Sequence, residues 1–230
     1  MATMMDPRKL VAEAVGTFTL IFAGCGSVML FTGNDRVTLV GVALAHGLAI
    51  AIMISALGAI SGGHFNPAVT IGIWVTRRID TMLAVGYIVA QLAGAAIAAA
   101  ALSMLYPEGL RSAATLGTPG LGAGIDFARG VGIEAVLTFF LVTAIFGTAV
   151  DSRAPKLGGL AIGLTITMDI LAGGPLTGAA MNPARAFGPA LLTGHWDDHL
   201  VYWIGPIVGA VIASLLYHYV FIEEKSPVGA

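Results

Sequence analysis

The sequence predicts an all-α membrane protein with six transmembrane helices and two re-entrant half-helices, arranged as an inverted repeat. Three observations support this fold class. Of the 230 residues, 57% are hydrophobic and only 10% are charged, which is more apolar surface than a soluble domain of this length can bury. Six apolar stretches are long enough to cross a bilayer, and the two halves of the chain share motifs. We expect a single domain over residues 1–230.

Six stretches approach the roughly 20 mainly apolar residues that are needed to cross the hydrocarbon core. In chain order they cover residues 9–31, 37–57, 81–106, 127–150, 157–172 and 200–222, and the fifth is the shortest. The first stretch continues past Cys25, so we interpret it as a retained helix rather than a cleaved leader. Two further apolar pieces, 66–75 and 182–192, are too short to cross the membrane.

Two motifs of the first half of the chain recur in the second half at the same separation, and a third, Glu13-Ala14-Val15 with Glu134-Ala135-Val136, recurs at a slightly longer one. Two motif pairs carry the repeat: Gly47-Leu48-Ala49-Ile50 with Gly163-Leu164-Thr165-Ile166, and Asn66-Pro67-Ala68 with Asn182-Pro183-Ala184. Because each half holds three spans, which is an odd number, the second half must enter the bilayer upside down, as in many transport proteins. We therefore expect inverted repeats over residues 1–115 and 116–230, whose short pieces point toward the midplane from opposite sides.

The charged residues predict an orientation and exclude some classes of function. One side of the predicted membrane holds Arg8, Lys9, Arg77, Arg78, Arg153, Lys156 and Lys225, and the other holds Arg36, Arg111 and Arg129. This excess predicts that both termini lie in the cytoplasm. The net charge of −2 offers no basic field to nucleic acid, and the single cysteine precludes a disulfide within the chain and a cysteine metal cluster. We expect no cofactor, no metal and no nucleic-acid partner.

The two Asn-Pro-Ala motifs predict half-helices that begin in the middle of the membrane. Asn is a favoured helix N-cap, and Pro suits the first helical position. Non-helical backbone is tolerated at this depth only where protein buries it or where it lines a wet cavity. The two helix N-termini would each bring about half a positive charge, while the amides of Asn66 and Asn182 donate to a passing oxygen. The pattern predicts a pore for neutral solutes that repels cations.

Residues 61–70 (SGGHFNPAVT) and 181–190 (MNPARAFGPA) resemble the motifs of the major intrinsic protein family, the aquaporins and glycerol facilitators. The resemblance covers almost the whole chain. It implies the aquaporin fold, a passive channel for water and small neutral solutes rather than an enzyme, and a homotetramer in membrane lipid with a pore in each subunit. Small residues at four-residue spacing, Ala90-Gly94-Ala98 and Gly205-Gly209-Ala213, would permit close helix approach between subunits or within one.

The resemblance also implies roles for polar residues inside the membrane. Glu13 and Glu134 occupy equivalent places in spans one and four, and each is implied to accept hydrogen bonds from the irregular loop before a half-helix; a proton relay is the alternative. His64 is implied to brace the first of these loops. Asp169 departs from the neutral residue that the family pattern implies, and we expect it to bond to an extracellular loop or to a neighbouring subunit.

A second constriction of the family is built from one residue of span two, one of span five and two of the second half-helix loop. The family spacing assigns this filter to His46, Ile170, Ala179 and Arg185. The set is similar to the filter of plant tonoplast-intrinsic proteins, which implies passage of water and ammonia, with hydrogen peroxide and urea as further candidates. Ala186 and Ala190 stand where glycerol facilitators carry an Asp and a Lys, so glycerol is disfavoured.

Some assignments stay open at this level. A water-only aquaporin and a secondary transporter of a small neutral solute are the alternatives, although a transporter needs clustered coupling-ion ligands. We expect a prokaryotic cytoplasmic membrane, with a vacuolar membrane as the alternative. Tyr202 and Trp203 fit the aromatic belt at a membrane interface. The loop that holds His195, Asp197, Asp198 and His199 is expected to be a solvated loop rather than a metal site.

Overall fold

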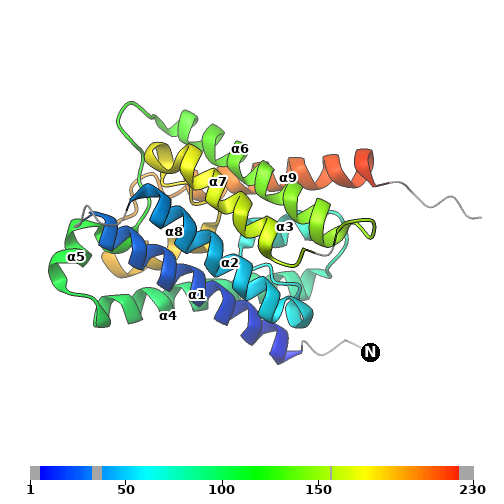
Figure 1. Ribbon diagram of the computed structural model, residues 1–230, viewed down its shortest axis with the longest axis horizontal. Helices are drawn as coiled ribbons and strands as arrows, with labels where there is room; N and C mark the ends of the chain where they lie inside the picture. Colours follow the sequence, from blue (N-terminus) through cyan, green and yellow to red (C-terminus); the bar gives the residue numbers. More distant parts are fainter. Residues whose placement is uncertain (1–5, 33–37, 156, 223–230) are drawn as a thin grey trace, which may run out of the picture.

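The computed structural model describes residues 6–32, 38–155 and 157–222, and these residues form helices and loops without a strand. The six predicted spans are confirmed as α1 (Pro7–Thr32), α2 (Leu39–Ser61), α4 (Thr81–Leu105), α6 (Phe127–Ile145), α7 (Leu160–Thr177) and α9 (Val201–Leu216). Figure 1 shows the start of α1 and the end of α9 at the same end of the bundle, which we call the terminal side. Four residues named above, Arg36, Val37, Lys156 and Lys225, lie outside the described residues.

Large apolar side chains cover the outside of the long helices. Val11, Ile52 and Val89 are each more than half exposed, at 60%, 56% and 61%. Water would solvate such a surface unfavourably, whereas the hydrocarbon of a bilayer covers it without cost. The chain is therefore an integral, multi-pass membrane protein.

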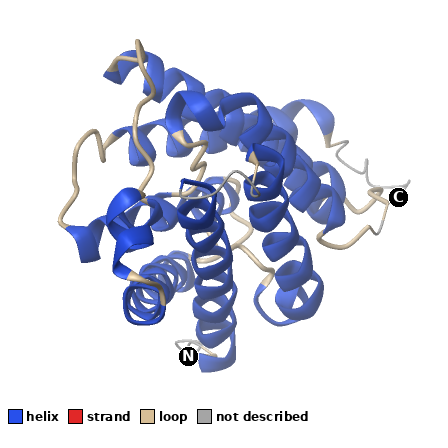
Figure 2. Cartoon of the chain, turned by 60° about the vertical axis from the view of Figure 1, so that its left-hand side comes forward, coloured by secondary structure: helices blue, strands red, loops and turns tan. Residues whose placement is uncertain are grey.

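The two short pieces form the helices α3 (Pro67–Val75) and α8 (Pro183–Thr193). Neighbouring long helices pair in the same way in both halves, since α1 packs against α4 and α6 packs against α9. The short helices exchange halves: α3 packs mainly against α9, and α8 packs mainly against α4 (Figure 1). Each half therefore completes the interior of the other. Figure 2 shows the described residues from another side as helices and loops only.

The helices α2 and α7 cross at the recurring glycine of the repeat. A Cβ atom on Gly47 would lie 2.4 Å from the carbonyl oxygen of Gly163, and a Cβ atom on Gly163 would lie 2.3 Å from that of Gly47. Only glycine permits this approach. The motif pair that revealed the repeat is thus the contact between its two halves.

The small-residue stripes of α4 and α9 are also used within one subunit. A Cβ atom on Gly94 would lie 2.3 Å from the carbonyl oxygen of Ala14 in α1, and one on Gly209 would lie 2.0 Å from that of Ala135 in α6. These glycines therefore let neighbouring helices of the same chain touch, as small residues do in membrane interfaces. The stripes no longer support contacts between subunits.

The structure differs from the sequence expectations at several helix ends. We expected the fifth span to stop at Ala172, before a glycine pair, but α7 continues through Pro175 to Thr177. Its last turn is held by tertiary contacts, because the hydroxyl of Thr177 donates to Glu134 at 2.7 Å, and it ends at Gly178 with a left-handed φ of 82°. The fourth and sixth predicted spans continue beyond α6 and α9 as η2 (Phe146–Val150) and η3 (Tyr217–Phe221). Two short helices that the sequence did not indicate, α5 (Glu108–Ala113) and η1 (Thr115–Gly117), lie between the third and fourth spans.

Candidate functional site

The half-helices α3 and α8 begin at buried asparagines that act as N-caps. The side-chain oxygen of Asn66 accepts from the backbone N–H of Ala68 at 2.9 Å, and that of Asn182 accepts from Ala184 at 3.0 Å. The first helical residue in each case is a proline, whose missing N–H would have had no helical partner. Ala68 and Ala184 are completely buried, so the two helix starts meet through small side chains.

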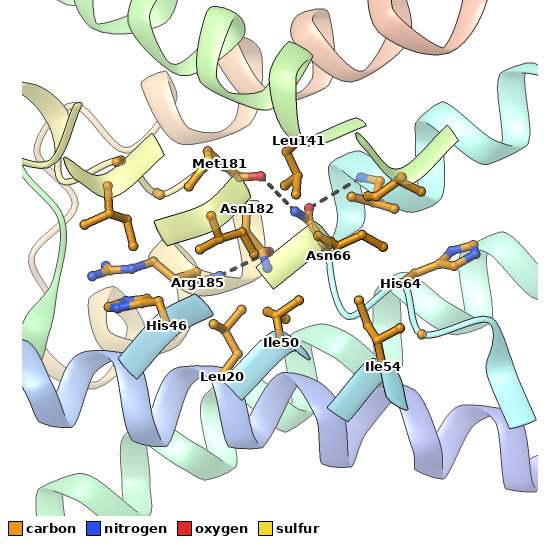
Figure 3. A pocket seen from close by; sticks show the side chains of 18 residues that line it. Leu20, His46, Ile50, Ile54, His64, Asn66, Leu141, Met181, Asn182 and Arg185 are labelled. Carbon is orange, nitrogen blue, oxygen red and sulfur yellow. Dashed lines mark hydrogen bonds between the residues drawn. The ribbon is translucent and has the colours of Figure 1, made fainter. Parts of the chain in front are cut away.

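Each capping asparagine is also tied to the opposite loop. Nδ2 of Asn66 donates to the carbonyl oxygen of Met181 at 2.8 Å (Figure 3). Nδ2 of Asn182 donates to that of Phe65 at 3.0 Å. Met181 and Phe65 have matching left-handed φ angles of 52° and 50°, a conformation that costs non-glycine residues about 1–2 kcal/mol. Because an amide has two hydrogens, each asparagine keeps one donor for the cavity that both of them line.

The carboxylate of Glu13 holds the first loop from behind. It is fully buried and accepts from the backbone N–H groups of His64 at 3.0 Å and Phe65 at 2.6 Å. The hydroxyl of Ser61 and the amide of Gln91 donate to it as well, at 2.6 and 2.7 Å. These four hydrogen bonds tie the first loop to α1 and α4.

Glu134 holds the second loop in the equivalent way. It is also fully buried and accepts from the backbone N–H groups of Ala180 at 2.9 Å and Met181 at 2.7 Å, and from the hydroxyl of Thr177 at 2.7 Å. A carboxylate that accepts several hydrogen bonds in this way stabilises irregular backbone that lacks helical partners. In both halves, a buried acid thus accepts hydrogen bonds from the backbone N–H groups of the loop before a half-helix.

Two tyrosines that sequence reasoning did not assign to the site complete this symmetric support. The hydroxyl of Tyr87 donates to the carbonyl oxygen of Ser61 at 2.6 Å, and that of Tyr202 donates to Thr177 at 2.9 Å. Both rings are about 1% exposed, so the expected interfacial position of Tyr202 is wrong. Tyr87 and Tyr202 occupy equivalent places in the third and sixth spans, and this repeat could have indicated their shared role from the sequence. A buried tyrosine usually has a hydrogen-bond partner for its hydroxyl.

His64 differs from its counterpart in the second loop, which is Ala180. Its Nδ1 lies 3.1 Å from the hydroxyl of Thr70, which itself donates to the carbonyl oxygen of Asn66 at 3.0 Å. Because that hydroxyl hydrogen is used, Nδ1 of His64 acts as the donor and Nε2 as the acceptor. His64 also lines the cavity, so it both braces the loop and faces the candidate pore.

A narrow cavity runs past both asparagines. Its volume of about 30 Å³ exceeds the roughly 10–15 Å³ that a cavity needs to hold a water molecule, so water can enter it. One wall is aliphatic and includes Leu20, Ile50, Ile54, Leu141, Ile145, Ile162 and Ile166. His64 and Ile54 also line a wider cavity of about 260 Å³ that contains Arg78, and this cavity extends the path toward the terminal side.

All four residues of the expected filter line this cavity, and we call them the ring of four: His46, Ile170, Ala179 and Arg185. Figure 3 shows His46 and Arg185 at one end of the cavity and His64 at the other. Nδ1 of His46 lies 2.9 Å from the carbonyl oxygen of Val42. A carbonyl can only accept, so in the neutral imidazole Nδ1 carries the hydrogen and Nε2 is the acceptor. The ring of four thus combines one neutral acceptor with one cation.

Arg185 is positioned by a turn that the sequence did not reveal. Its Nη1 donates to the carbonyl oxygen of Gly117 at 2.9 Å, and its guanidinium is almost completely buried. Gly117 ends a turn in which three successive residues have left-handed φ angles: 46° at Thr115, 54° at Leu116 and 77° at Gly117. Thr and Leu adopt this conformation at a cost of about 1–2 kcal/mol each, which indicates that tertiary contacts hold the turn in place.

Asp169 lies outside this cavity lining. It is fully buried in α7, and neither carboxylate oxygen has a hydrogen-bond partner among the described residues. The expected bond to an extracellular loop is therefore not found within the described chain.

The described loop before α9 combines polar contacts between near neighbours with one ring contact to α8, between Trp196 and Phe187 at 6.1 Å. Nε1 of Trp203 donates to Nε2 of His199 at 3.1 Å, and partial burial lowers the pKa of His199 from its ordinary value. His195 faces Asp197 at 3.7 Å in an exposed pair. Within the described ranges no group of three or more potential metal ligands comes together.

Comparisons with known proteins agree with this geometry. The family model described as major intrinsic protein matches residues 1–217. Aquaporin TIP4-4 of Zea mays is 45% identical over 227 residues, which cover 94% of this chain and 88% of that protein. Aquaporin-8 of Mus musculus is 41% identical over 221 residues, which cover 95% and 84%.

A solved structure shares the fold. The X-ray structure of the aquaglyceroporin from Plasmodium falciparum superposes with a TM-score of 0.83 at 27% sequence identity, and the match covers 94% of this chain and 96% of that one. The chain therefore belongs to the major intrinsic protein family and is an aquaporin-type channel of the membrane.

Proposed function

We propose that this chain passively conducts water and ammonia, with hydrogen peroxide and urea as further candidate solutes, and excludes protons and cations. One observation carries the proposal. The ring of four combines an imidazole from α2, an aliphatic side chain from α7 and an alanine with the guanidinium of Arg185, all in the lining of one narrow cavity. The aliphatic wall and the small alanine leave space beside the two polar groups, so a neutral solute slightly larger than water can enter.

Cation exclusion is supported by the charges that face the cavity. Arg185 is permanently charged and lines the cavity. The N-termini of α3 and α8 point toward the same cavity and together contribute about one positive charge in the dipole picture. The described lining residues include histidines and arginine but no carboxylate, so a cation would meet unfavourable potential along the path.

Passage of ammonia is supported by the hydrogen-bonding pattern of the ring of four. Arg185 offers donors to a solute lone pair, and Nε2 of His46 offers an acceptor to a solute N–H or O–H. Ammonia, hydrogen peroxide and urea carry both functions, as water does. In this proposal Ile170 keeps the second wall apolar, so the imidazole and the guanidinium orient the solute.

The test uses purified protein in proteoliposomes. Stopped-flow swelling measures water permeability, and an internal pH dye under an ammonium gradient measures ammonia permeability. A channel gives water flux with a low activation energy and no saturation. Water flux without ammonia flux would favour the water-only alternative, and saturable flux that needs an ion gradient would favour the transporter.

We also propose inverted repeats over residues 1–115 and 116–230, with both termini in the cytoplasm. The equivalent hydrogen bonds of Glu13 and Glu134 support the repeat, and the basic residues support the orientation. Relatives from Zea mays that carry the TIP name favour the vacuolar alternative over a prokaryotic cytoplasmic membrane. Protease access to a tag after Ala230 in sealed vesicles tests the orientation, and membrane fractionation of native cells tests the location.

A further inference from the structure

The helix α1 passes directly behind His46 at a glycine. A Cβ atom on Gly24 would lie 2.4 Å from Nε2 of His46 and 2.6 Å from its Cδ2. Cβ atoms do not approach other heavy atoms so closely, because repulsion rises steeply inside van der Waals contact. The imidazole can therefore occupy its observed place only because residue 24 has no side chain.

The imidazole has little freedom to move elsewhere. Its Nδ1 is tied to the carbonyl oxygen of Val42 on its own helix at 2.9 Å, and the side chain is 4% exposed. The free space beside it is the cavity, which it lines together with Arg185 (Figure 3). A group added on the α1 side would displace the imidazole into the cavity.

The next residue of α1 supports the other polar member of the ring of four. Sγ of Cys25 lies 3.7 Å from the carbonyl oxygen of Gly117, the same oxygen that accepts from Arg185 at 2.9 Å. A Cβ atom on Gly117 would lie 2.7 Å from Cβ and 2.8 Å from Cα of Cys25. The turn that holds Arg185 thus rests on the α1 backbone at Cys25.

We infer that Gly24 and Cys25 form a second layer behind the ring of four and are positioning residues for solute selectivity. Gly24 determines how far the His46 imidazole extends into the cavity. Cys25 determines the position of the Gly117 carbonyl group, and thereby the position of the Arg185 guanidinium that donates to it. The inference rests on the proposed role of the ring of four. It adds α1, which contributes none of the four residues, to the elements that determine which solutes pass.

The first test is Gly24→Ala, measured as the ratio of ammonia to water permeability in proteoliposomes. One added methyl displaces neighbouring side chains in a packed interior, so the imidazole narrows the constriction. Because the larger solute is affected first, we expect the ratio to fall by at least about threefold. The matched control is Gly26→Ala in the same helix, where a Cβ atom would lie 2.7 Å from the hydroxyl of Tyr106 and away from His46. The control should leave the ratio unchanged.

Removal of the imidazole shows whether Gly24→Ala acts by displacing His46 or by disrupting the packing of α1 in general. His46→Ala should change the ratio by itself, and Gly24→Ala added to His46→Ala should change it no further, because the group that the methyl displaces is gone. If Gly24→Ala alone fails to fold, the thermal stability of the double variant replaces the flux comparison, and it should match that of His46→Ala. The inference is overturned if Gly24→Ala leaves the ratio of ammonia to water permeability unchanged or raises it. It is also overturned if Gly24→Ala still lowers this ratio in the His46→Ala background. If His46→Ala itself leaves the ratio unchanged, the proposed filter is wrong.

The Cys25 contact is tested by its effect on cation exclusion. Cys25→Leu adds bulk against Gly117 and should shift the carbonyl away from Arg185, which raises the permeability to methylammonium. Cys25→Ser keeps a small donor and is the matched control. Equal exclusion of methylammonium by both folded variants would overturn the role of Cys25.

Discussion

Asn66 and Asn182 hold each other's loops, since each donates one amide hydrogen to the carbonyl group that precedes the other asparagine. The two distances are 2.8 Å to Met181 and 3.0 Å to Phe65. Each side-chain oxygen meanwhile caps its own half-helix. The asparagines therefore join two helix starts across the midplane and still present one donor each to the cavity.

Asn66→Asp should weaken this junction while it preserves the cap. The carboxylate keeps an oxygen for the N–H of Ala68 but places a second oxygen against the carbonyl of Met181. We expect a loss of about 1–3 kcal/mol in the free energy of unfolding and a measurable sodium leak, because a negative charge now faces the cavity. Thermal unfolding in detergent and sodium flux in proteoliposomes measure the two effects. Asn182→Asp should behave similarly, and unchanged values in both variants would contradict the junction.

Glu13→Gln should destabilise the protein more than Glu134→Gln. Both changes leave one acceptor oxygen and place an NH₂ group against backbone donors of the loop. Glu13 accepts from four donors and Glu134 from three, so more donors lose their partner at Glu13. We expect losses of about 2–4 kcal/mol in the free energy of unfolding. Thermal unfolding shows which of the two variants is less stable. If both variants were as stable as the unmodified protein, the bracing role would be excluded.

Arg185→Val should admit cations and larger solutes while water flux stays substantial. The change removes the permanent charge of the ring of four and frees the carbonyl of Gly117, whereas the donors of Asn66 and Asn182 remain. Flux of methylammonium and of water, measured on the same vesicles, tests this expectation. If the variant failed to fold, Arg185→Lys would supply the comparison, because it keeps the charge and loses the planar fork.

Exchange of two ring residues should alter ammonia selectivity. His46→Phe combined with Ile170→His moves the imidazole from α2 to α7 and adds an aromatic wall. We expect ammonia permeability to fall by about tenfold at matched water permeability, since one extra or missing contact in a narrow site changes discrimination by about that factor. The pH-dye assay with an ammonium gradient measures it. Equal ammonia permeability in both proteins would show that these residues do not set selectivity.

We predict a homotetramer. The exposed apolar side chains of α1, α2 and α4 need lipid or another subunit to cover them, and the family resemblance implies four subunits. The native mass in mild detergent should be four times the 23.4 kDa of one chain. A mass of one chain across several detergents would rule out the tetramer.

The sequence by itself determined the features that depend on local chemistry and on spacing. Length and hydropathy placed the six spans, because the thickness of a bilayer fixes how many apolar residues cross it. Asn followed by Pro defined the starts of α3 and α8, because the cap bonds to N–H groups only two and three residues away. Family spacing pointed to His46, Ile170, Ala179 and Arg185, which the structure brings to one cavity.

Only the tertiary structure decided the contacts that join residues distant in the chain. The carbonyl oxygen of Gly117 accepts a hydrogen bond from Arg185, and that of Thr177 accepts one from Tyr202. From the sequence, Tyr202 was expected at the membrane interface. The helix α7 continues past a glycine pair and a proline, because Glu134 anchors its last turn. Such contacts leave no periodic signal in the sequence, since the free energy that stabilises them comes from groups that lie on other helices. The same reason hid the approach of Gly24 to His46, which depends on how α1 crosses α2.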